Sequence, residues 1–369
     1  MNSNSPINLH YYLCDQETLL SFNIAYSDNK ITGIGHQLSD QIRDIQIITD
    51  CNPKQPMIPY PDIYKSPETL DLQLAQIMAI EAHYRCEVPE YARLVRILLL
   101  EMHRLLNHFN FFSTLAFAVQ FPKLLEKSVV NSAIIRTLLS KIDKVQSLNK
   151  YFIIGGIATD LPTGFIENLA DSIQVIDKRL GYFEKQLIRK TVLSNLLEDV
   201  GIISPVHAKT CSLSGPNLYA SLPRTDYSLV TASLLPGSLH MEPVKTDFHK
   251  GTIGDSWHRS WIRFMEIEQS LRLITQLTSV ILKTDINLMV QPFLSGRDSD
   301  FIFNFNHAEG QIISHISKSQ HNHYITGKHQ YPVLNVIENL DSILTGERVS
   351  SAKIILSSLN LNPIKYHVR

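Results

Sequence analysis

A long helical pattern in the sequence runs from residue 89 to about residue 118. Apolar residues recur there at every third or fourth position, and Pro89 stands where the first turn of a helix tolerates proline. The apolar positions form one continuous stripe: Ala92, Val95, Leu99, Met102, Leu106 and Phe109. The charged residues of the segment fall elsewhere on the helix surface. This pattern predicts a long helix that packs against other helices.

Other parts of the chain show the same spacing or a β-rich one. We expect further helices at about residues 69–84, 127–149, 164–197, 256–283 and 333–345. LLSFNIAYS and KITGIG, joined by a polar SDN turn, predict a hairpin, and the proline-rich stretch 51–68 predicts a loop. FIFNFNH, GQIISHIS and HYITGKHQ predict a small sheet, and AKIILSSL is β-like.

These elements predict a mainly helical α+β fold in a single domain, residues 1–369. Its parts are a β-rich region at 1–60, a helical body at 61–284 and a second β-rich region at 285–369.

Composition excludes several classes of function. Lys and Arg total 34 against 35 Asp and Glu, so no strong field attracts nucleic acid or an anionic membrane. The four cysteines lie far apart without a C-x-x-C pair, and no metal site is expected. No stretch approaches the ~18 apolar residues of a spanning helix. Membrane association is therefore expected only through partners.

Six segments, in a consistent order, resemble the large hydrogenase-like subunit of respiratory complex I, which is the D subunit of the bacterial enzyme. CEVPEYARLVRILLLEMHRLLNHF resembles the family helix V-P-x-R-A-x-x-I-R-x-x-x-x-E-L-x-R-I-x-S-H, with Glu101, Arg104 and His108 in matching places. IGDSWHRSWIRFMEIEQSLRLI resembles G-D-x-x-D-R-x-x-V-R-x-x-E-M-x-x-S-x-x-I-I. The residues in place there are Gly254, Asp255, Arg259, Arg263, Glu266 and Ser270.

The other segments extend the resemblance over nearly the whole chain. IIGGIATDLPTGF resembles R-x-G-G-V-x-x-D-L-P and retains Asp160, and DVGIISPVHAKTCSLSGPNLYAS resembles a further glycine-rich segment. AEGQIISHIS resembles a strand of the family, and Arg369 falls on the family's terminal arginine.

The resemblance implies a fold like that of the nickel–iron hydrogenase large subunit, without the nickel–iron centre, whose two C-x-x-C pairs are absent. It implies one subunit of an NADH-quinone oxidoreductase that forms a quinone cavity against an iron–sulfur subunit. The iron–sulfur cluster would lie only in that partner. Other peripheral-arm subunits and a membrane arm would be further partners, on the cytoplasmic or matrix face. Catalysis by the chain alone is not expected.

The loops that converge on the family's redox site differ. Leu13 stands about where the family has a histidine suited to a quinone oxygen, and Ile153 replaces the arginine of R-x-G-G. Counting back from Glu81 puts Ser66 on the family's quinone-binding tyrosine, whereas a two-residue shift recruits Tyr64. Tyr64 is therefore the quinone-binding candidate. The alternative hypothesis is a non-catalytic structural paralogue that has lost the quinone site.

Two groups of polar residues have a structural and a functional interpretation. Glu101, Arg104 and His108 could form one polar row, which is either a satisfied interhelical hydrogen-bond network or a proton relay. The second group, Asp255, Arg259, Arg263 and Glu266, has the spacing of ion pairs along one helix, solvated or between helices. We favour the structural interpretation for both.

The histidines of the C-terminal region and the Gly155–Gly156 pair also have simple interpretations. His307, His315, His321, His323 and His329 are expected to be surface residues, since no carboxylate or cysteine completes a metal site around the pair His321 and His323. Gly155 and Gly156 are expected to permit a tight turn or close packing, because no G-x-G-x-x-G motif is present.

Overall fold

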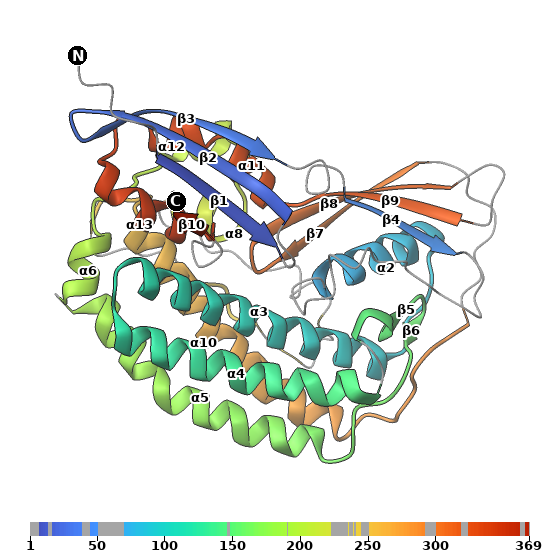
Figure 1. Ribbon diagram of the computed structural model, residues 1–369. Coiled ribbons are helices and arrows are strands. Elements are labelled where there is room, and N and C mark those ends of the chain that lie inside the picture. The colour runs from blue at the N-terminus through green and yellow to red at the C-terminus, as the bar shows by residue number, and fades with distance from the viewer. Residues whose placement is uncertain are drawn as a thin grey trace.

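Four long helices lie side by side and form the body of the protein (Figure 1). They are α3 (Glu90–Ala118), α4 (Pro122–Val145), α5 (Phe165–Ile188) and α10 (Ser256–Ile281). The structure is a computed structural model that describes residues 7–13, 17–38, 45–50, 70–145, 148–189, 191–222, 235, 239, 241–244, 251–291, 300–318, 324–361 and 366–368. Helix α3 packs against both α4 and α10, and α5 packs against α4 and α10.

Helix α3 is buried on nearly every side, because other elements surround it. The predicted apolar stripe is buried as expected, with Ala92 and Phe109 both 0% exposed. The charged side chains that we placed elsewhere on the surface of this helix are buried too, including Arg96, Glu101 and Arg104. Their positions therefore face neighbouring elements rather than water, which agrees with the interhelical interpretation of Glu101 and Arg104.

The predicted helix at 164–197 divides into α5 and α6 (Val192–Leu197). Thr191 interrupts it: its hydroxyl accepts a hydrogen bond from the backbone N–H of Ser194 at 3.2 Å, and Ser194 Oγ accepts one from the N–H of Thr191. This reciprocal pair is a capping box, which begins a new helix. The other predicted helices differ by a few residues at their ends, as in α4, which begins at Pro122.

Strands from both ends of the chain form the first sheet, whose order is β10-β1-β2-β3. Its strands are β1 (Ile7–Leu13), β2 (Glu17–Ser27), β3 (Lys30–Leu38) and β10 (Tyr366–Val368). The predicted hairpin is confirmed as β2–β3, with Asp28 and Asn29 both at positive φ, as its two-residue turn requires. The pairing of β10 with β1 was not predicted.

The second sheet also joins distant segments, in the order β4-β9-β8-β7. The predicted C-terminal strands are confirmed as β7 (Phe301–His307), β8 (Gly310–Lys318) and β9 (Tyr324–Gln330), and β4 (Ile45–Asp50) adds a fourth. Helix α2 (Leu70–Tyr84) packs on β7 and β8 and also contacts α3 (Figure 1). This arrangement brings the ends of the chain against its centre.

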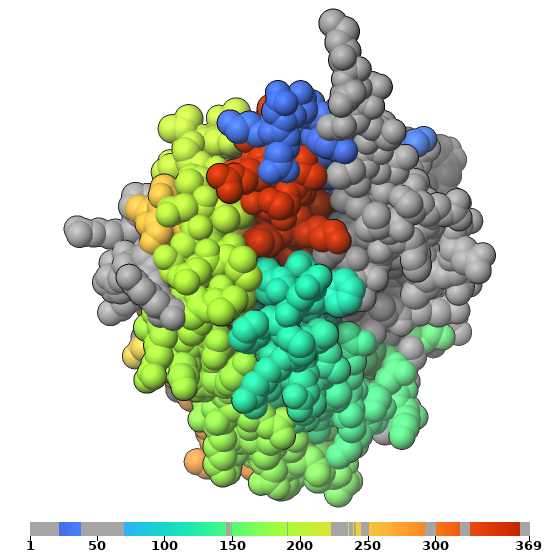
Figure 2. Space-filling view, turned by 60° about the vertical axis from the view of Figure 1, so that its left-hand side comes forward, coloured from blue at the N-terminus to red at the C-terminus, as the bar shows by residue number. Residues whose placement is uncertain are grey.

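The C-terminal part contains short helices where we expected one helix and a strand. The helix predicted at 333–345 is two, α11 (Val333–Glu338) and α12 (Leu340–Leu344). AKIILSSL is not β-like but forms α13 (Ala352–Ser358), preceded by the 3₁₀ turn η4 (Val349–Ser351). Its buried Ala352, Ile355 and Leu356 have helical spacing and pack towards α3. Figure 2 shows these helices in red between the N-terminal strands and the helical body.

Short elements complete the fold: the 3₁₀ turn η3 (Leu148–Lys150), β5 (Phe152–Ile153), β6 (Gly156–Ile157), α7 (Pro205–Thr210) and α8 (Gly215–Tyr219). The mainly helical α+β class is confirmed. The hydrogenase-like body and the single-domain organisation with boundaries at residues 60 and 284 stay predictions. In the part of the chain that is described, no helix is both long and apolar enough to cross a membrane.

Candidate functional site

A buried polar network joins α3 to α10. Arg104 Nη1 donates to Glu101 Oε2 at 3.1 Å within α3, and Arg104 Nη2 donates to Gln269 of α10. Ser270 Oγ donates to Glu101 Oε2 at 2.6 Å. All four side chains are at most 7% exposed. The predicted interhelical network of Glu101 and Arg104 therefore exists, and both residues bond across the helix interface.

His108 extends this network one turn further along α3. Its Nε2 lies 2.6 Å from Glu266 Oε2 on α10, and Arg104 Nε lies 3.9 Å from the same oxygen. Burial lowers the pKa of His108; the carboxylate of Glu266 opposes this, and the charges of Arg263 and Arg104 reinforce it. Burial thus favours the neutral form of the imidazole, which lies in contact with Glu266.

The side chain of Arg263 extends from α10 to the turn between β7 and β8. Its two terminal nitrogens donate to the two carboxylate oxygens of Glu309 at 3.2 and 3.1 Å, and its guanidinium lies 4.5 Å from the centre of the Phe111 ring. Burial raises the pKa of Glu309, but the charge and hydrogen bonds of Arg263 outweigh it, so the pKa is lowered. This bidentate geometry favours a lasting ion pair.

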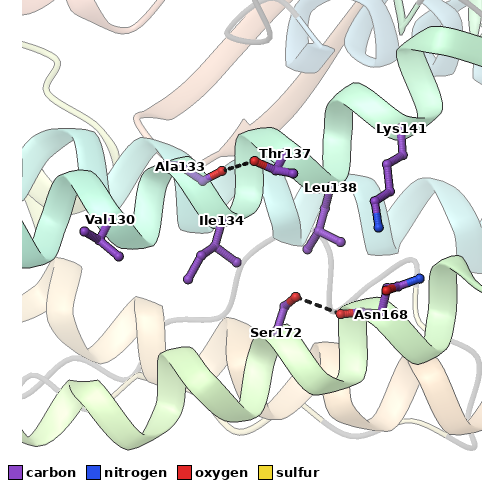
Figure 3. Close-up of a pocket in the computed structure, with 8 residues that line it drawn as sticks. All are labelled: Val130, Ala133, Ile134, Thr137, Leu138, Lys141, Asn168 and Ser172. Carbon is purple, nitrogen blue, oxygen red and sulfur yellow. Dashed lines mark hydrogen bonds between the residues drawn. The ribbon is translucent and has the colours of Figure 1, made fainter.

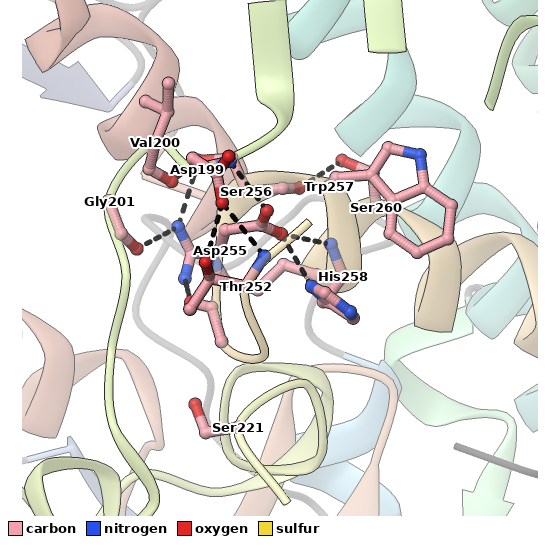
Figure 4. Close-up of polar contacts among 12 residues, drawn as sticks. Asp199, Val200, Gly201, Ser221, Thr252, Asp255, Ser256, Trp257, His258 and Ser260 are labelled. Carbon is pink, nitrogen blue, oxygen red and sulfur yellow. Dashed lines mark hydrogen bonds and ion pairs between the residues drawn. The ribbon is translucent and has the colours of Figure 1, made fainter. Parts of the chain in front are cut away.

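Asp255 caps α10 (Figure 4). Its Oδ1 accepts from the backbone N–H of His258 at 2.9 Å and lies 2.7 Å from His258 Nδ1, while Oδ2 accepts from the N–H of Asp199 at 2.8 Å. Arg259 instead donates to the carbonyl oxygens of Gly254 and Gly201 at 2.6 and 2.9 Å. Burial lowers the pKa of Arg259 to about 10, an effect that Asp255 opposes.

No ion pair forms among the four residues of the predicted row along this helix, but the interhelical alternative holds for Glu266, which lies 2.6 Å from His108 and 3.9 Å from Arg104 of α3. Asp255, Arg259, Arg263 and Glu266 are all buried, and each bonds mainly to a partner that the spacing did not indicate. The partners come from other elements or from the helix cap, because α10 lies inside the protein and shows little of its surface to water. Of the two alternatives left open, solvated pairs are excluded for these four residues.

A second buried ion pair holds the Gly155–Gly156 turn. Arg96 donates to both carboxylate oxygens of Glu81 at 2.8 and 2.7 Å, and also to the carbonyl oxygens of Ile153 and Gly156 at 2.7 and 2.8 Å. Glu81 accepts from the N–H of Gly155 at 2.7 Å. Arg96 thus brings a guanidinium to the turn where the resemblance would place an arginine at residue 153.

The expected role of the two glycines is confirmed. Gly155 has a φ of +86°, which suits a tight turn. A Cβ on Gly156 would lie 2.0 Å from the carbonyl oxygen of Leu288, so only glycine allows this close approach. Nearby, Asp160 accepts hydrogen bonds from the hydroxyl of Tyr91 and from the N–H of Leu161. Asp160 therefore anchors this loop to α3.

Three buried residues that we did not single out as a group meet between α2, α3 and β7. Asp71 Oδ1 lies 2.7 Å from His103 Nδ1, and Asp71 Oδ2 lies 2.9 Å from His307 Nδ1. Burial raises the pKa of Asp71, but the charges and hydrogen bonds of the two histidines outweigh it and hold the pKa well below its usual range. Because 236 residues separate Asp71 from His307, sequence spacing offered no signal for this contact.

The C-terminal histidines divide into buried and exposed ones. His307 and His329 are 5% and 3% exposed, so the expectation of surface residues is wrong for these two. His329 Nδ1 lies 2.9 Å from Ser314 Oγ, and burial lowers its pKa to about 4. His315 is exposed. His321 and His323 lie outside the described residues, among which no group of three His, Cys, Asp or Glu side chains is arranged to hold a metal ion.

Hollows of the described surface lie away from most of the network. A groove of about 400 Å³ runs between α4 and α5, with Val130, Ile134 and Leu138 on one side and Ser172 on the other (Figure 3). A second hollow, of about 360 Å³, is lined by Gln269 and Arg272 of α10. Tyr64, Ser66 and Arg369 lie outside the described residues, and so does the side chain of Leu13.

Comparison with known proteins finds similar sequences in one family. The model of the family described as "Respiratory-chain NADH dehydrogenase, 49 Kd subunit" matches residues 135–299. The D subunit of NADH-quinone oxidoreductase from Bacillus thuringiensis subsp. konkukian is 23% identical over 308 residues, which cover 83% of this chain and 82% of the relative. That of Bacillus anthracis is 23% identical over 306 residues, with the same coverage.

A relative of another kind shares a shorter region. The C/D subunit of NADH-quinone oxidoreductase from Methylococcus capsulatus is 28% identical over 203 residues, which are 55% of this chain and 34% of the relative. The chain thus spans about a third of that relative. The family model and these relatives confirm the resemblance read from the motifs, and the low identity fits the many replaced loop residues. The chain is thus similar to the 49 kDa, or D, subunit of NADH-quinone oxidoreductase, and these matches support a divergent member of that family.

Proposed function

We propose that the chain is the large subunit of a complex I-like NADH-quinone oxidoreductase and forms one wall of a quinone cavity against an iron–sulfur subunit. The observation that carries this proposal is the α3–α10 interface. Glu101, Arg104, His108 and Glu266, which match the family motifs, contact one another or a shared partner in the buried core. A framework that keeps these contacts can position the loops of a cavity.

The partners and cofactors in this proposal follow from the relatives, which are named as subunits of NADH-quinone oxidoreductase. The iron–sulfur partner would carry the cluster. Further peripheral-arm subunits and a membrane arm would complete the assembly. The chain would then lie on the cytoplasmic or matrix face, attached through its partners.

Tyr64 is the residue of this chain that would hydrogen-bond a quinone oxygen. Its phenol O–H can donate a hydrogen bond, whereas the aliphatic side chains of Leu13 and Ile153 cannot. The test is quinone reduction by the native assembly that carries Tyr64→Phe. We expect the rate to fall by at least tenfold, because the variant loses only the hydroxyl. Tyr60→Phe, four residues earlier in the same proline-rich segment, is the matched control and should keep the rate.

A second function is favoured by the turn at Gly155–Gly156. The guanidinium of Arg96 donates its hydrogen bonds to Glu81 and to two carbonyl groups. It therefore stabilises the turn and has little capacity left to bind a ligand. A non-catalytic paralogue that maintains the fold and the partner surfaces would need this stabilised turn but would need no redox residue. An assembly that reduces quinone equally well with Tyr64 or Phe at residue 64 would contradict the first proposal at that residue. An intact assembly without any quinone reduction would support the paralogue.

A further inference from the structure

The groove between α4 and α5 brings apolar side chains into contact with water. It has a volume of about 400 Å³, and Val130, Ile134 and Leu138 of α4 line one side of it (Figure 3). Val130 is 40% exposed, and Val175, which follows Ser172 by one turn of α5, is 41% exposed. Because contact between apolar groups and water is unfavourable, a surface that covered this groove would gain free energy.

The shape of the groove suits a third helix. One row of side chains on α4 runs along it at intervals of three or four residues: Val130, Ile134, Thr137 and Lys141. The row is roughly 16 Å long, given the rise of an α-helix. Ala133 beside it is small and exposed, so a neighbouring backbone can approach closely. A helix of about three turns can therefore pack between the ridges of α4 and α5.

Polar side chains of the groove already donate hydrogen bonds within their own helices. Thr137 Oγ1 donates to the carbonyl oxygen of Ala133 at 2.8 Å, and Ser172 Oγ donates to that of Asn168 at 2.7 Å (Figure 3). The side-chain amide of Asn168 donates to the carbonyl oxygen of Gly164. An apolar surface can therefore cover the groove without leaving these donors unpaired.

Cationic side chains stand at both ends of the groove. Lys141 lines one end, and its side chain points from α4 towards α5 in Figure 3. At the other end, Arg179 of α5 donates to Asn131 of α4 at 3.3 Å, and Lys127 Nζ lies 5.0 Å from the centre of the Tyr182 ring. These contacts join the two helices there, so the groove begins beyond them.

The α4 wall of the groove is more basic than the rest of the protein. Helix α4 carries five Lys or Arg residues and two acidic ones, a net charge of +3, in a chain whose net charge is −1. The charges of α5 are nearly balanced, with four acidic residues and three basic ones. A partner with carboxylates at both ends of an apolar stretch would complement this wall.

We propose that the groove between α4 and α5 docks an amphipathic helix of another protein, whose apolar residues pack on Val130 and whose carboxylates reach Lys127 and Lys141. A lipid bilayer is a poorer match, because a flat surface does not enter a groove whose Leu138 is only 3% exposed. A single acyl chain would stay in contact with water, because Ala133 on the rim is exposed. The contact does not depend on whether the chain binds quinone.

The test is photo-cross-linking of the full chain in the cells that produce it, with p-benzoylphenylalanine in place of Val130. We expect mass spectrometry to identify a segment of another protein that has apolar residues at every third or fourth position and a carboxylate near each end. The same group in place of Val206, which is 75% exposed on α7, is the matched control and should not capture that segment. The proposal is overturned by the absence of a protein adduct, by capture from both positions, or by an adduct with a phospholipid, a second copy of the chain or a segment without this pattern.

Charge variants test the electrostatic part of the proposal. Lys127→Glu combined with Lys141→Glu should lower the yield of the adduct from residue 130 by about fivefold, because repulsion would replace two surface ion pairs. Lys209→Glu combined with Lys353→Glu, at exposed positions of α7 and α13, is the matched control and should leave the yield unchanged. Equal yields from the two double variants would contradict the proposal.

Discussion

Buried charges in this protein persist because each one has a specific partner. Arg96 and Glu81 show this most clearly: both are nearly excluded from water, and their two-pronged contact also ties the Gly155 turn to α2 and α3. A buried pair of this kind adds little compared with apolar residues, but loss of one partner leaves the other charge uncompensated. The residues of the site thus maintain geometry first.

Removal of the Arg96 guanidinium should therefore destabilise the folded protein strongly. We expect Arg96→Met to lower the free energy of unfolding by about 3–5 kcal/mol, since Glu81 would remain buried without its partner. Urea unfolding of the purified chain measures this. Arg272→Met, which removes a pair whose arginine side chain is 61% exposed, should cost less than about 1 kcal/mol. Equal losses in the two variants would contradict the account.

His329 gives the protein a defined response to acid. Burial, with the charge of His315, lowers its pKa to about 4, whereas an unfolded histidine titrates near about 6.5. Between these values the unfolded chain binds a proton that the folded protein does not. The contribution of His329 is therefore complete above pH 6.5 and is lost as the pH falls towards 4, by up to about 1.4 kcal/mol per pH unit.

This dependence can be measured by urea unfolding at several pH values from 4 to 6.5. We expect His329→Gln to flatten the fall in stability over that range. His36→Gln, at an exposed position of β3, should leave it unchanged. An unchanged slope in His329→Gln would show that His329 does not cause the response.

Helix α10 begins at a residue whose chemistry explains the start of the helix. The carboxylate of Asp255 accepts the N–H of His258 and also holds its ring and the backbone of Asp199, so the cap fixes both the start of the helix and the preceding loop. Ser204 caps the shorter α7 with one hydrogen bond at an exposed site. The two caps should therefore contribute different amounts to the free energy of unfolding.

Asp255→Ala should lower the free energy of unfolding by more than about 2 kcal/mol, because the loss of the cap adds to the loss of the partner of buried His258. Ser204→Ala should cost about 1 kcal/mol, as an ordinary cap does. Thermal and urea unfolding compare them. A loss in Asp255→Ala no greater than that in Ser204→Ala would contradict the role given to this cap.

Two glycines allow a matched test of close packing between elements. Gly156→Ala would force a Cβ to within 2.0 Å of the Leu288 carbonyl oxygen, and we expect it to cost about 1–3 kcal/mol. Gly181 lies on the exposed side of α5 with no atom within 4 Å of its Cβ position, so Gly181→Ala should stabilise by about 0.5–1 kcal/mol. Both are measured as free energies of unfolding. Opposite signs are the expected result.

The elements that periodicity could predict are those with long patterns. Helices α3 and α10 and the β2–β3 hairpin were readable because apolar spacing and turn residues act locally. Periodicity does not indicate the break at Thr191, because the capping box interrupts an otherwise continuous helical pattern. It does not identify α13 as a helix either, because the short apolar run fits both the helical and the strand period. The polar partners depended on contacts over long sequence distances, as between Asp71 and His307, which no local pattern carries.

At the scale of the whole molecule, the two ends of the chain pair with each other beside the helical body (Figure 1). Strand β10 pairs with β1, β4 pairs with β9, and the N–H of Ile34 donates to Asp341 at 2.7 Å. Family motifs revealed the framework, because α3 and α10 retain the matching residues in contact. Whether the chain forms a quinone cavity depends instead on loops whose residues differ from the family motifs, such as those of Leu13 and Ile153.

We propose that the chain, with this framework, is a subunit of a complex I-like assembly. Isolation of the native assembly through a tag on this chain, followed by iron analysis and identification of the bound proteins, tests it most directly. We expect an iron–sulfur subunit to co-purify with the chain in a one-to-one ratio. Recovery of the chain by itself, with neither iron nor a second subunit, would contradict the account.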